Sequence, residues 1–322
     1  MIIVTGANGF IGSAIVSELN QHSNEEIIAI DSVDQNTRNL LKNKKIRQFY
    51  LADELWSLLA QPEFKEKITW VIHMGACSST TEKNWEYLYE NNFLYSQRVF
   101  EWCAQNQKGL IYASSGATYG AGENGFDDLF DSEKLKPLNL YGESKVIMDR
   151  WALKQQATPE HWYGLKFFNV FGPNEYKKES MASVAFKAYH QISKTGQLGL
   201  FKSYNPLYQD GEQLRDFIYV KDITTWILEL MQKKPLFGIY NMGFGQARSW
   251  LDMSKALFSS LGVEHKIEWL EMPDNLKTQY QYFTEAKMQK WNKAGMSAPK
   301  WNLERAIDDY VKNYLAPGEV LF

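Results

Sequence analysis

Cysteine is scarce in this chain. Among 322 residues there are two, Cys77 and Cys103, and both fall in apolar or helical surroundings. Two such thiols support neither a disulfide framework nor a metal cluster, so we expect no bound metal. A chain that needs no disulfides suits a reducing compartment, and we expect a cytoplasmic protein.

An excess of charge of one sign is also missing. The 35 Lys and Arg residues nearly balance the 38 Asp and Glu residues, and the two signs are interspersed along the chain. The formal net charge of -3 leaves no basic surface for a nucleic acid backbone. Nucleic acid is therefore excluded as an expected partner.

Long apolar runs, internal repeats and low-complexity segments are absent as well. No apolar run approaches membrane-spanning length, and Met1 leads directly into a strand pattern without the features of a signal peptide. We expect neither a membrane partner nor export. Aromatic residues, in contrast, are abundant at 15% with 11 Trp, and most of them should belong to a core.

The chain opens with a strand, a glycine turn and a helix. The β-branched residues 2–5 are followed by Gly6-Ala7-Asn8-Gly9-Phe10-Ile11-Gly12 and a helical pattern through Leu19. Gly6 permits the tight turn, Gly9 lets the backbone approach a pyrophosphate, and Gly12 allows close packing of the helix. Backbone N–H groups and the helix dipole then hold phosphates. The G-x-x-G-x-x-G spacing predicts a dinucleotide site.

The next strand, residues 26–31, ends in an acid. Asp31 lies where a carboxylate takes the adenosine ribose hydroxyls, which favours NAD. Arg38 follows seven residues later and could meet a 2′-phosphate, which Asp31 alone would repel. The two signals conflict. Asp53, after a third short strand, is expected near the adenine, with loop capping as the alternative.

Two further strand patterns lead to the site. Residues 70–76 read as a buried strand whose small terminal residues leave room for a cofactor, and His73 within it reads as a packed core residue. The strand 109–115 ends on Ser115, whose hydroxyl can donate to a substrate hydroxyl or a developing carbonyl oxygen.

The segment Tyr141-Gly142-Glu143-Ser144-Lys145 reads as an acid/base pair. A tyrosine and a lysine four residues apart share one face of a helix, so the ammonium can lie close to the phenol. A neighbouring cation favours phenolate, and we expect a lowered pKa for Tyr141.

Glycine turn, Ser115 on a strand, and Tyr141 with Lys145 on a helix together resemble the extended short-chain dehydrogenase/reductases that act on nucleotide sugars, the NAD-dependent epimerase/dehydratase family. The resemblance covers nearly the whole chain. It implies that Ser115 and Tyr141 contact the reacting oxygen and that Lys145 also holds the nicotinamide ribose.

Several segments resemble one group of this family, the ADP-L-glycero-D-manno-heptose 6-epimerases. They are residues 75–82, 168–173, 178–186, 215–220 and 280–284, which occur in the same order. The 4,6-dehydratases carry an Asp-Glu pair after the serine or threonine, where this chain has Gly116-Ala117, so dehydration lacks its acid and base. The group implies an ADP-heptose substrate, a role in lipopolysaccharide core synthesis, and a homo-oligomer, with a homopentamer suggested.

Chemistry gives this resemblance a mechanism. A carbinol C–H is not acidic, so inversion at C6 of a heptose needs transient oxidation to an aldehyde and re-reduction with NADP. Rotation about the C5–C6 bond moves the oxygen, so one base cannot serve both positions. The resemblance supplies Tyr141 as one acid/base and Lys178 as the second. Lys178 would need a pKa lowered by burial or by a positive neighbour such as Lys177.

The motifs and the resemblance assign the remaining binding residues. Those expected to bind the cofactor are Gly6, Gly9, Phe10, Ile11, Gly12, Asp31, Ser32, Arg38, Asp53, Met74, Gly75, Ala76, Cys77, Ser78, Asn91, Lys145, Val170 and Lys178. Those expected to bind the sugar nucleotide are Asn169, Ser180, Lys187, Phe201, Arg215 and Tyr280, with Arg215 on the diphosphate.

Two departures from the group concern the substrate pocket. Lys187 stands where the group usually has histidine, and the 201–206 loop is followed by extra residues before Arg215. The group's use of NADP outweighs the NAD signal of Asp31, with NAD as the alternative and Arg38 as the ligand of the 2′-phosphate.

The order of elements predicts an α/β fold, a Rossmann-type doubly wound parallel sheet with a smaller substrate-binding lobe. We expect residues 1–170 and 214–245 to bind NADP, and residues 171–213 and 246–322 to form the lobe that closes on the substrate. Strands at 217–220 and 238–241 should return to the main sheet.

Two other functions are compatible with the same motifs. A UDP-sugar 4-epimerase shares Ser115, Tyr141 and Lys145 but can use the single tyrosine for both faces, so Lys178 discriminates between the two enzymes. A non-catalytic, dinucleotide-sensing regulator has no need of those three residues.

Overall fold

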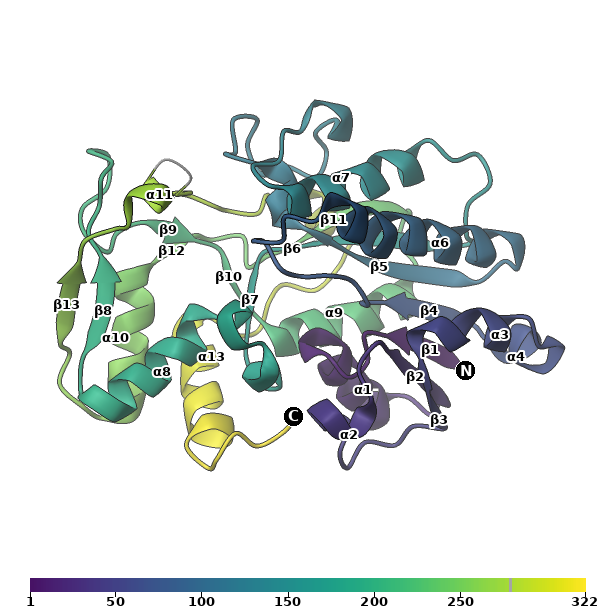
Figure 1. Cartoon of the computed structure of the whole chain (residues 1–322), viewed down its shortest axis with the longest axis horizontal. Helices are drawn as coiled ribbons and strands as arrows, with labels where there is room; N and C mark the ends of the chain where they lie inside the picture. The colour runs from purple at the N-terminus through teal and green to yellow at the C-terminus, as the bar shows by residue number, and fades with distance from the viewer. Residues whose placement is uncertain (278–279) are drawn as a thin grey trace.

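A computed structural model describes residues 1–277 and 280–322. Its centre is a seven-stranded sheet in the order β11-β6-β5-β4-β1-β2-β3, and every neighbouring pair is parallel (Figure 1). The predicted doubly wound Rossmann-type sheet is confirmed. The strands are β1 Ile2–Thr5, β2 Ile27–Asp31, β3 Gln48–Leu51, β4 Trp70–His73, β5 Gly109–Ser115, β6 Trp162–Phe167 and β11 Gly238–Met242.

Helices cover both faces of the sheet because its inner strands are apolar on both sides. One face packs against α1 Phe10–His22 and α9 Val220–Lys233, and the other packs against α6 Tyr95–Gln105 and α7 Leu140–Leu153 (Figure 1). Trp162 and Trp226 are fully buried in these two layers, as expected for most of the aromatic excess. Shorter helices complete this part of the chain: α2 Gln35–Arg38, α3 Leu55–Leu59, α4 Pro62–Lys67 and α5 Trp85–Leu88.

A smaller lobe lies beside the sheet with a hydrophobic cluster of its own (Figure 1). In it, β8 Leu198–Phe201 pairs in parallel with β13 Ile267–Leu270, and β9 Leu214–Arg215 pairs antiparallel with β12 Arg248–Ser249. Its helices are α8 Val184–Thr195, α10 Trp250–Leu261, α11 Asp274–Lys277 and α13 Leu303–Tyr310, while α12 Gln289–Lys293 buries Trp291 against the main core. The exact division of the chain into two domains stays a proposal.

One strand expected in the main sheet lies elsewhere. β10 Phe217–Tyr219 pairs with β7 Asn169–Phe171 in a separate two-stranded sheet, and Val220 begins α9 instead of ending a strand. The expectation for residues 217–220 was wrong because β11 pairs with one edge of β6, from Tyr163 to Phe167, and β5 pairs with the other. No edge of β6 is left for β10.

A buried ion pair joins α7 to the sheet. The Lys166 ammonium on β6 lies 3.6 Å from the Asp149 carboxylate on α7, and both side chains are almost wholly inaccessible, at 1% and 0% exposure. Asp149 also accepts hydrogen bonds from the Tyr112 hydroxyl at 3.0 Å and the Ser114 hydroxyl at 2.7 Å, both on β5. The pair therefore fixes α7 against the two strands beside it.

Removing one partner of this pair should be costly, because the other is left charged and buried. We expect Lys166→Met to lower the free energy of unfolding by about 3–5 kcal/mol in urea denaturation at pH 7. Lys154→Met, which breaks the exposed pair with Glu133 just after α7, should cost less than about 1 kcal/mol. Equal losses in the two variants would contradict this interpretation.

Candidate active site

The candidate site lies at the carboxyl ends of the central strands, where the strand order reverses between β1 and β4. In open α/β sheets, ligands bind at this point because the loops leaving neighbouring strands diverge there. The loops after β1, β2, β4 and β5 all end at this edge, as does the N-terminus of α1. They carry most of the residues that the sequence predicts for the cofactor.

The glycine turn has the close backbone approach that its spacing predicts. Gly6 has a φ of +64°, and a Cβ there would lie 2.7 Å from the backbone nitrogen of Gly75. A Cβ on Gly12 would lie 2.0 Å from the carbonyl oxygen of Gly6. Only glycine allows this turn to stay in contact with α1 and with the loop after β4. Gly9 caps α1 without a side-chain hydrogen bond, so backbone N–H groups open toward the turn.

The Asp31 carboxylate, at the end of β2, accepts hydrogen bonds from the backbone. It is 5% exposed, and its two oxygens accept hydrogen bonds from the Asn8 N–H at 2.9 Å and the Val33 N–H at 3.1 Å. The Asn8 side chain in turn donates to the Asp34 carbonyl at 3.1 Å and accepts from the Leu40 N–H at 3.0 Å. The acid therefore fixes the glycine turn to the loop that leads to Arg38.

Lys178 lies beside the glycine turn. Its ammonium is 5.6 Å from the centre of the Phe10 ring, and Phe10 also packs with Val170 and Ile11. Burial lowers the pKa of Lys178, the negative charge of Glu175 opposes this shift, and the positive charge of Arg38 adds to it. The expected direction is thus found, with Arg38 in place of Lys177 as the cationic neighbour.

A chain of hydrogen bonds through Thr5, His73 and Ser96 fixes the loop after β4. The Thr5 hydroxyl accepts from the Gly75 N–H at 3.0 Å and lies 2.6 Å from Nδ1 of His73. The other ring nitrogen of His73 lies 3.0 Å from the Ser96 hydroxyl. Burial lowers the pKa of His73 to about 3, so the ring is neutral. His73 is a packed core residue, as the sequence indicates.

Asn92 is a residue of this loop's support that the sequence did not single out. Its side-chain oxygen accepts from the Cys77 N–H at 2.8 Å, while its amide donates to the Cys77 carbonyl at 3.0 Å and to the Ser144 hydroxyl at 2.9 Å. Asn92 thereby ties the loop to α7. The neighbouring Asn91, predicted to bind cofactor, is half-buried and donates to the Tyr87 carbonyl.

Ser115, Tyr141 and Lys145 come together as predicted. Ser115 ends β5, and its hydroxyl accepts from the Ala117 N–H at 3.1 Å. Tyr141 is in the first turn of α7, which Asn139 caps by accepting from the Gly142 N–H at 2.8 Å. One turn later, the Lys145 ammonium donates to the Ala113 carbonyl on β5 at 3.0 Å. Helix and strand thus hold the three side chains from opposite sides.

The pKa of Tyr141 does not shift in the direction that the sequence suggested. Burial raises the pKa of Tyr141, and a hydrogen bond with Ser115 only partly offsets that effect. The pKa of Lys145 is itself lowered to about 8 by burial. The expectation was wrong because removal from water penalises the phenolate and the ammonium alike, and the ammonium is turned toward a carbonyl.

A guanidinium lies at the lobe side of the site. Arg215, on β9, is 8% exposed, and its guanidinium carbon lies 5.3 Å from the Tyr280 ring centre and 5.6 Å from the Trp250 ring centre. Within the described residues, the guanidinium donates one hydrogen bond, to the Leu214 carbonyl at 2.9 Å. No carboxylate pairs with it in that part of the chain. Such an arrangement leaves donors free for an anion.

The remaining predicted residues are arranged around these groups. Asn169 starts β7 and donates to the Asp216 carbonyl at 3.1 Å, and the exposed Lys187 donates to the Ser180 carbonyl at 2.5 Å. Within the described residues, no hydrogen bond or ion pair joins Lys178 to Tyr141 or Ser115. The other predicted binding residues with partly or fully accessible side chains are Ser32, Asp53, Met74, Ala76, Ser78, Ser180 and Phe201.

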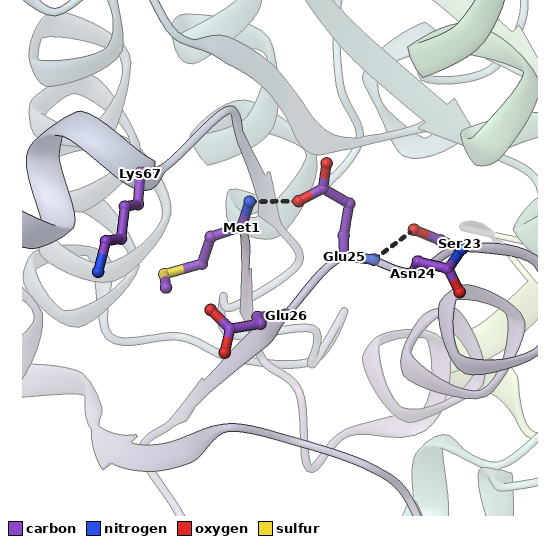
Figure 2. Close-up of a pocket in the computed structure, with 6 residues that line it drawn as sticks. All are labelled: Met1, Ser23, Asn24, Glu25, Glu26 and Lys67. Carbon is purple, nitrogen blue, oxygen red and sulfur yellow. Dashed lines mark hydrogen bonds and ion pairs between the residues drawn. The ribbon is translucent and has the colours of Figure 1, made fainter.

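Two observations bear on other kinds of site. A hollow lined by Met1, Ser23, Asn24, Glu25, Glu26 and Lys67 lies at the opposite edge of the sheet, where β1 and β2 begin (Figure 2). It contains none of the predicted groups. Across the described ranges, no three His, Cys, Asp or Glu side chains are placed to share a metal ion. In the same ranges, no helix has the length and apolarity to cross a bilayer.

Comparison with known proteins agrees with this geometry. Residues 2–243 match the model of the NAD dependent epimerase/dehydratase family. The ADP-L-glycero-D-manno-heptose-6-epimerase of Fusobacterium nucleatum is 44% identical over 98% of each chain, and that of Nitratidesulfovibrio vulgaris is 42% identical over 99% of each.

Solved structures show the same architecture. The crystal structure of Helicobacter pylori ADP-L-glycero-D-manno-heptose-6-epimerase has a TM-score of 0.78 at 26% identity and covers 97% of this chain and 95% of that one. A UDP-N-acetylglucosamine 4-epimerase from Methanobrevibacter ruminantium has a TM-score of 0.80 at 22% identity, covers 98% of both chains, and shows the fold alone. The resemblance inferred from the motifs is confirmed, and with it a nicotinamide dinucleotide as cofactor and a nucleotide sugar as substrate. The chain belongs to the NAD dependent epimerase/dehydratase family, whose ADP-L-glycero-D-manno-heptose-6-epimerases it resembles over nearly its whole length.

Proposed function

We propose that this chain is an isomerase that interconverts ADP-D-glycero-β-D-manno-heptose and ADP-L-glycero-β-D-manno-heptose at C6, in lipopolysaccharide core heptose synthesis. The observation that carries the proposal is identity of 42–44% to enzymes of that name over 98–99% of both chains. Across the family, fold likeness alone does not distinguish 4-epimerases from 6-epimerases, whereas identity at this level over the full length favours the 6-epimerases.

The residues at the strand ends fit a dinucleotide. The glycine turn, with no room for a Cβ at Gly6 or Gly12, leaves backbone close to the N-terminus of a 13-residue helix, where phosphate is stabilised. The loop of Met74 to Ser78 and the residues Ile11 and Val170 border the same edge. The dinucleotide would supply a hydride acceptor and donor at C6, which makes the overall reaction redox-neutral.

NADP is the cofactor that the local charges favour. The Asp31 carboxylate is buried and accepts two backbone hydrogen bonds. The two N–H dipoles partly offset its negative charge, so it repels a phosphate less than a carboxylate without such partners would. Arg38 belongs to the segment that Asn8 ties to the glycine turn through Asp34 and Leu40. A guanidinium there is suited to a 2′-phosphate.

Tyr141 is the first proton carrier of the proposal. Its phenol lies with the Ser115 hydroxyl, so both can contact one substrate oxygen, and Lys145 lies one turn along α7. In its phenolate form, Tyr141 would take the hydroxyl proton as the C6–H bond breaks and the hydride passes to the bound dinucleotide, leaving an aldehyde. The lobe would exclude water while the aldehyde rotates about C5–C6.

Lys178 is the second proton carrier. It belongs to another loop from Tyr141, beside Phe10, and burial lowers its pKa, which makes the ammonium a better proton donor. After rotation, Lys178 would donate a proton to the oxygen in its new position, while Arg215 would hold the diphosphate through its unpaired donors. The reverse reaction uses the same groups in the opposite order.

Several finer statements belong to this proposal. We propose an NADP-binding domain of residues 1–170 and 214–245 and a substrate-binding domain of residues 171–213 and 246–322. We also propose that the protein is a homo-oligomer located in the cytoplasm, and the residue assignments given above are part of the same proposal. Of the competing functions, a UDP-sugar 4-epimerase has only fold likeness in its favour. A non-catalytic regulator has none, because the relatives are enzymes.

Incubation of the purified protein with ADP-D-glycero-β-D-manno-heptose tests the reaction. We expect NMR to show conversion to a mixture of the two C6 epimers, without net consumption of NADP, because the hydride is returned. UDP-glucose should give no UDP-galactose under the same conditions. Unchanged heptose in the presence of bound cofactor would refute the substrate assignment.

Lys178→Met tests the second proton carrier. We expect kcat to fall by about 10²–10⁴-fold with KM little changed, because a general acid/base acts mainly in the transition state. Lys177→Met is the matched control, since Lys177 is exposed and adjacent in the chain, and it should retain activity within about twofold. An active Lys178→Met enzyme would mean that one tyrosine serves both faces.

Arg38→Ala tests the preference for NADP. Loss of a charge-assisted contact with the 2′-phosphate should weaken NADP binding by about 10–100-fold and leave NAD binding nearly unchanged, as measured by calorimetric titration. Arg47→Ala, which removes an exposed arginine paired with Glu26, serves as the control and should change neither affinity. Equal losses for the two cofactors would argue against a phosphate ligand at Arg38.

A further inference from the structure

Glu175 is a buried acid that the proposed reaction does not yet use. It begins the 3₁₀ turn Glu175–Lys177 between β7 and α8, and it is 1% exposed. The carboxylate forms no salt bridge within the described residues. Burying an ionised carboxylate this deeply is costly unless several hydrogen-bond donors replace the lost water.

Four donors from three separate segments converge on this carboxylate. One oxygen accepts from the Gly172 N–H at 3.1 Å, the Ser183 hydroxyl at 2.8 Å and the Tyr310 hydroxyl at 3.1 Å. The other accepts from the Ser183 N–H at 2.5 Å. Ser183 also caps α8 by accepting from the Phe186 N–H at 3.1 Å. Glu175 therefore closes the 172–183 loop on itself and fastens it to α13.

Lys178 is part of the loop that Glu175 closes. The Lys178 N–H donates to the Glu175 carbonyl at 2.9 Å, and the Met181 N–H donates to the Lys178 carbonyl at 2.9 Å. The side chain of Lys178 then reaches Phe10 on α1. Its position beside the glycine turn thus depends on a loop whose two ends are held by one carboxylate.

The charged groups around Lys178 come from two elements. Glu175, in its own loop, favours the ammonium, while Arg38 on α2 disfavours it, and Phe10 on α1 contributes no charge. Tyr310 on α13 faces Glu175, and burial keeps its pKa well above the ordinary value, so it remains a neutral donor. Burial raises the pKa of Glu175, and its hydrogen bonds with Ser183, Gly172 and Tyr310 oppose that shift; in its ionised form Glu175 supplies the negative charge that acts on Lys178.

We propose that Glu175 is a positioning residue for Lys178: its four hydrogen bonds hold the 172–183 loop so that the Lys178 ammonium stays beside the glycine turn. In its ionised form the same carboxylate also favours the protonated form of Lys178. This inference rests on the proposed role of Lys178 as the second proton carrier. It assigns to Glu175 no contact with substrate or cofactor.

The test compares Glu175→Gln with Asp222→Asn. Asp222 is a matched control, since it is also buried, accepts backbone hydrogen bonds from Lys300 at 2.8 Å and Trp301 at 3.2 Å, and is not among the charges that shift the pKa of Lys178. Both variants should lose stability. Only Glu175→Gln should lower the pKa of Lys178, by about 1 unit, because it removes an opposite charge.

Two readouts are needed. The pH dependence of acetylation of Lys178 in the NADP-loaded enzyme, followed by mass spectrometry, gives its pKa without substrate. In the pH profile of kcat for epimerisation, the limb set by Lys178 should move to lower pH by the same amount, with KM retained. Glu175→Asp, which keeps the charge, should leave the limb within about half a unit of the wild-type position even if it destabilises the loop.

The outcomes separate the two levels of inference. Wild-type activity with identical Lys178 titration in Glu175→Gln would leave Glu175 a purely structural clamp and overturn the proposal. Should the Gln variant not fold, a limb displaced by a full unit or more in Glu175→Asp, which keeps the charge, would overturn it instead. A shift of equal size in Asp222→Asn would do the same. An inactive wild-type enzyme would defeat the proposed reaction, while the acetylation experiment would still decide whether Glu175 controls Lys178.

Discussion

Removing positive charge from water is the constraint on which the candidate site depends. Lys145, Lys166, Lys178 and Arg215 are all at least partly buried, and burial opposes the charged form of each. Desolvation of an ammonium or guanidinium is costly unless carboxylates, carbonyls or a bound anion replace the lost water. The way each cation is compensated therefore indicates what it does in the fold.

The four cations differ in their compensation. Lys166 is paired with Asp149 at 3.6 Å in the core and stabilises the packing of α7. Lys145 lies one turn after Tyr141 and donates to a strand carbonyl, and the negative charge of Asp149 favours its protonated form. Lys178 is compensated by the charge of Glu175 and the Phe10 ring, and Arg215 by two aromatic rings and the Leu214 carbonyl. Under the proposed function, the substrate diphosphate would complete the compensation of Arg215.

These buried charges are gathered at one edge because the sheet is parallel. Every central strand ends at the same edge, so the loops after β1, β4 and β5 bring the glycine turn, the Met74–Ser78 loop and Ser115 together. α7 then packs across β5 with its first turn at that edge. The second lobe adds Arg215 and Tyr280 from segments that are far away in the sequence. The site is thus shared between a rigid sheet and a loop, 172–183, that depends on a single carboxylate.

The sequence alone determined the fold class, the glycine turn and the placement of Tyr141 and Lys145 on one helix face, because each follows from local spacing on a strand or helix. The place of Ser115 beside them followed from the resemblance to a known family. Gly6, Gly12 and the cap of α7 act over a few residues, and the resemblance to known enzymes rests on the same local motifs. Only the tertiary structure decided that β10 pairs with β7, that Asn92 supports the cofactor loop from a π-helical turn, and that burial raises the pKa of Tyr141. Edge occupancy, side-chain direction in an irregular helix and desolvation depend on distant segments, and no local pattern encodes them.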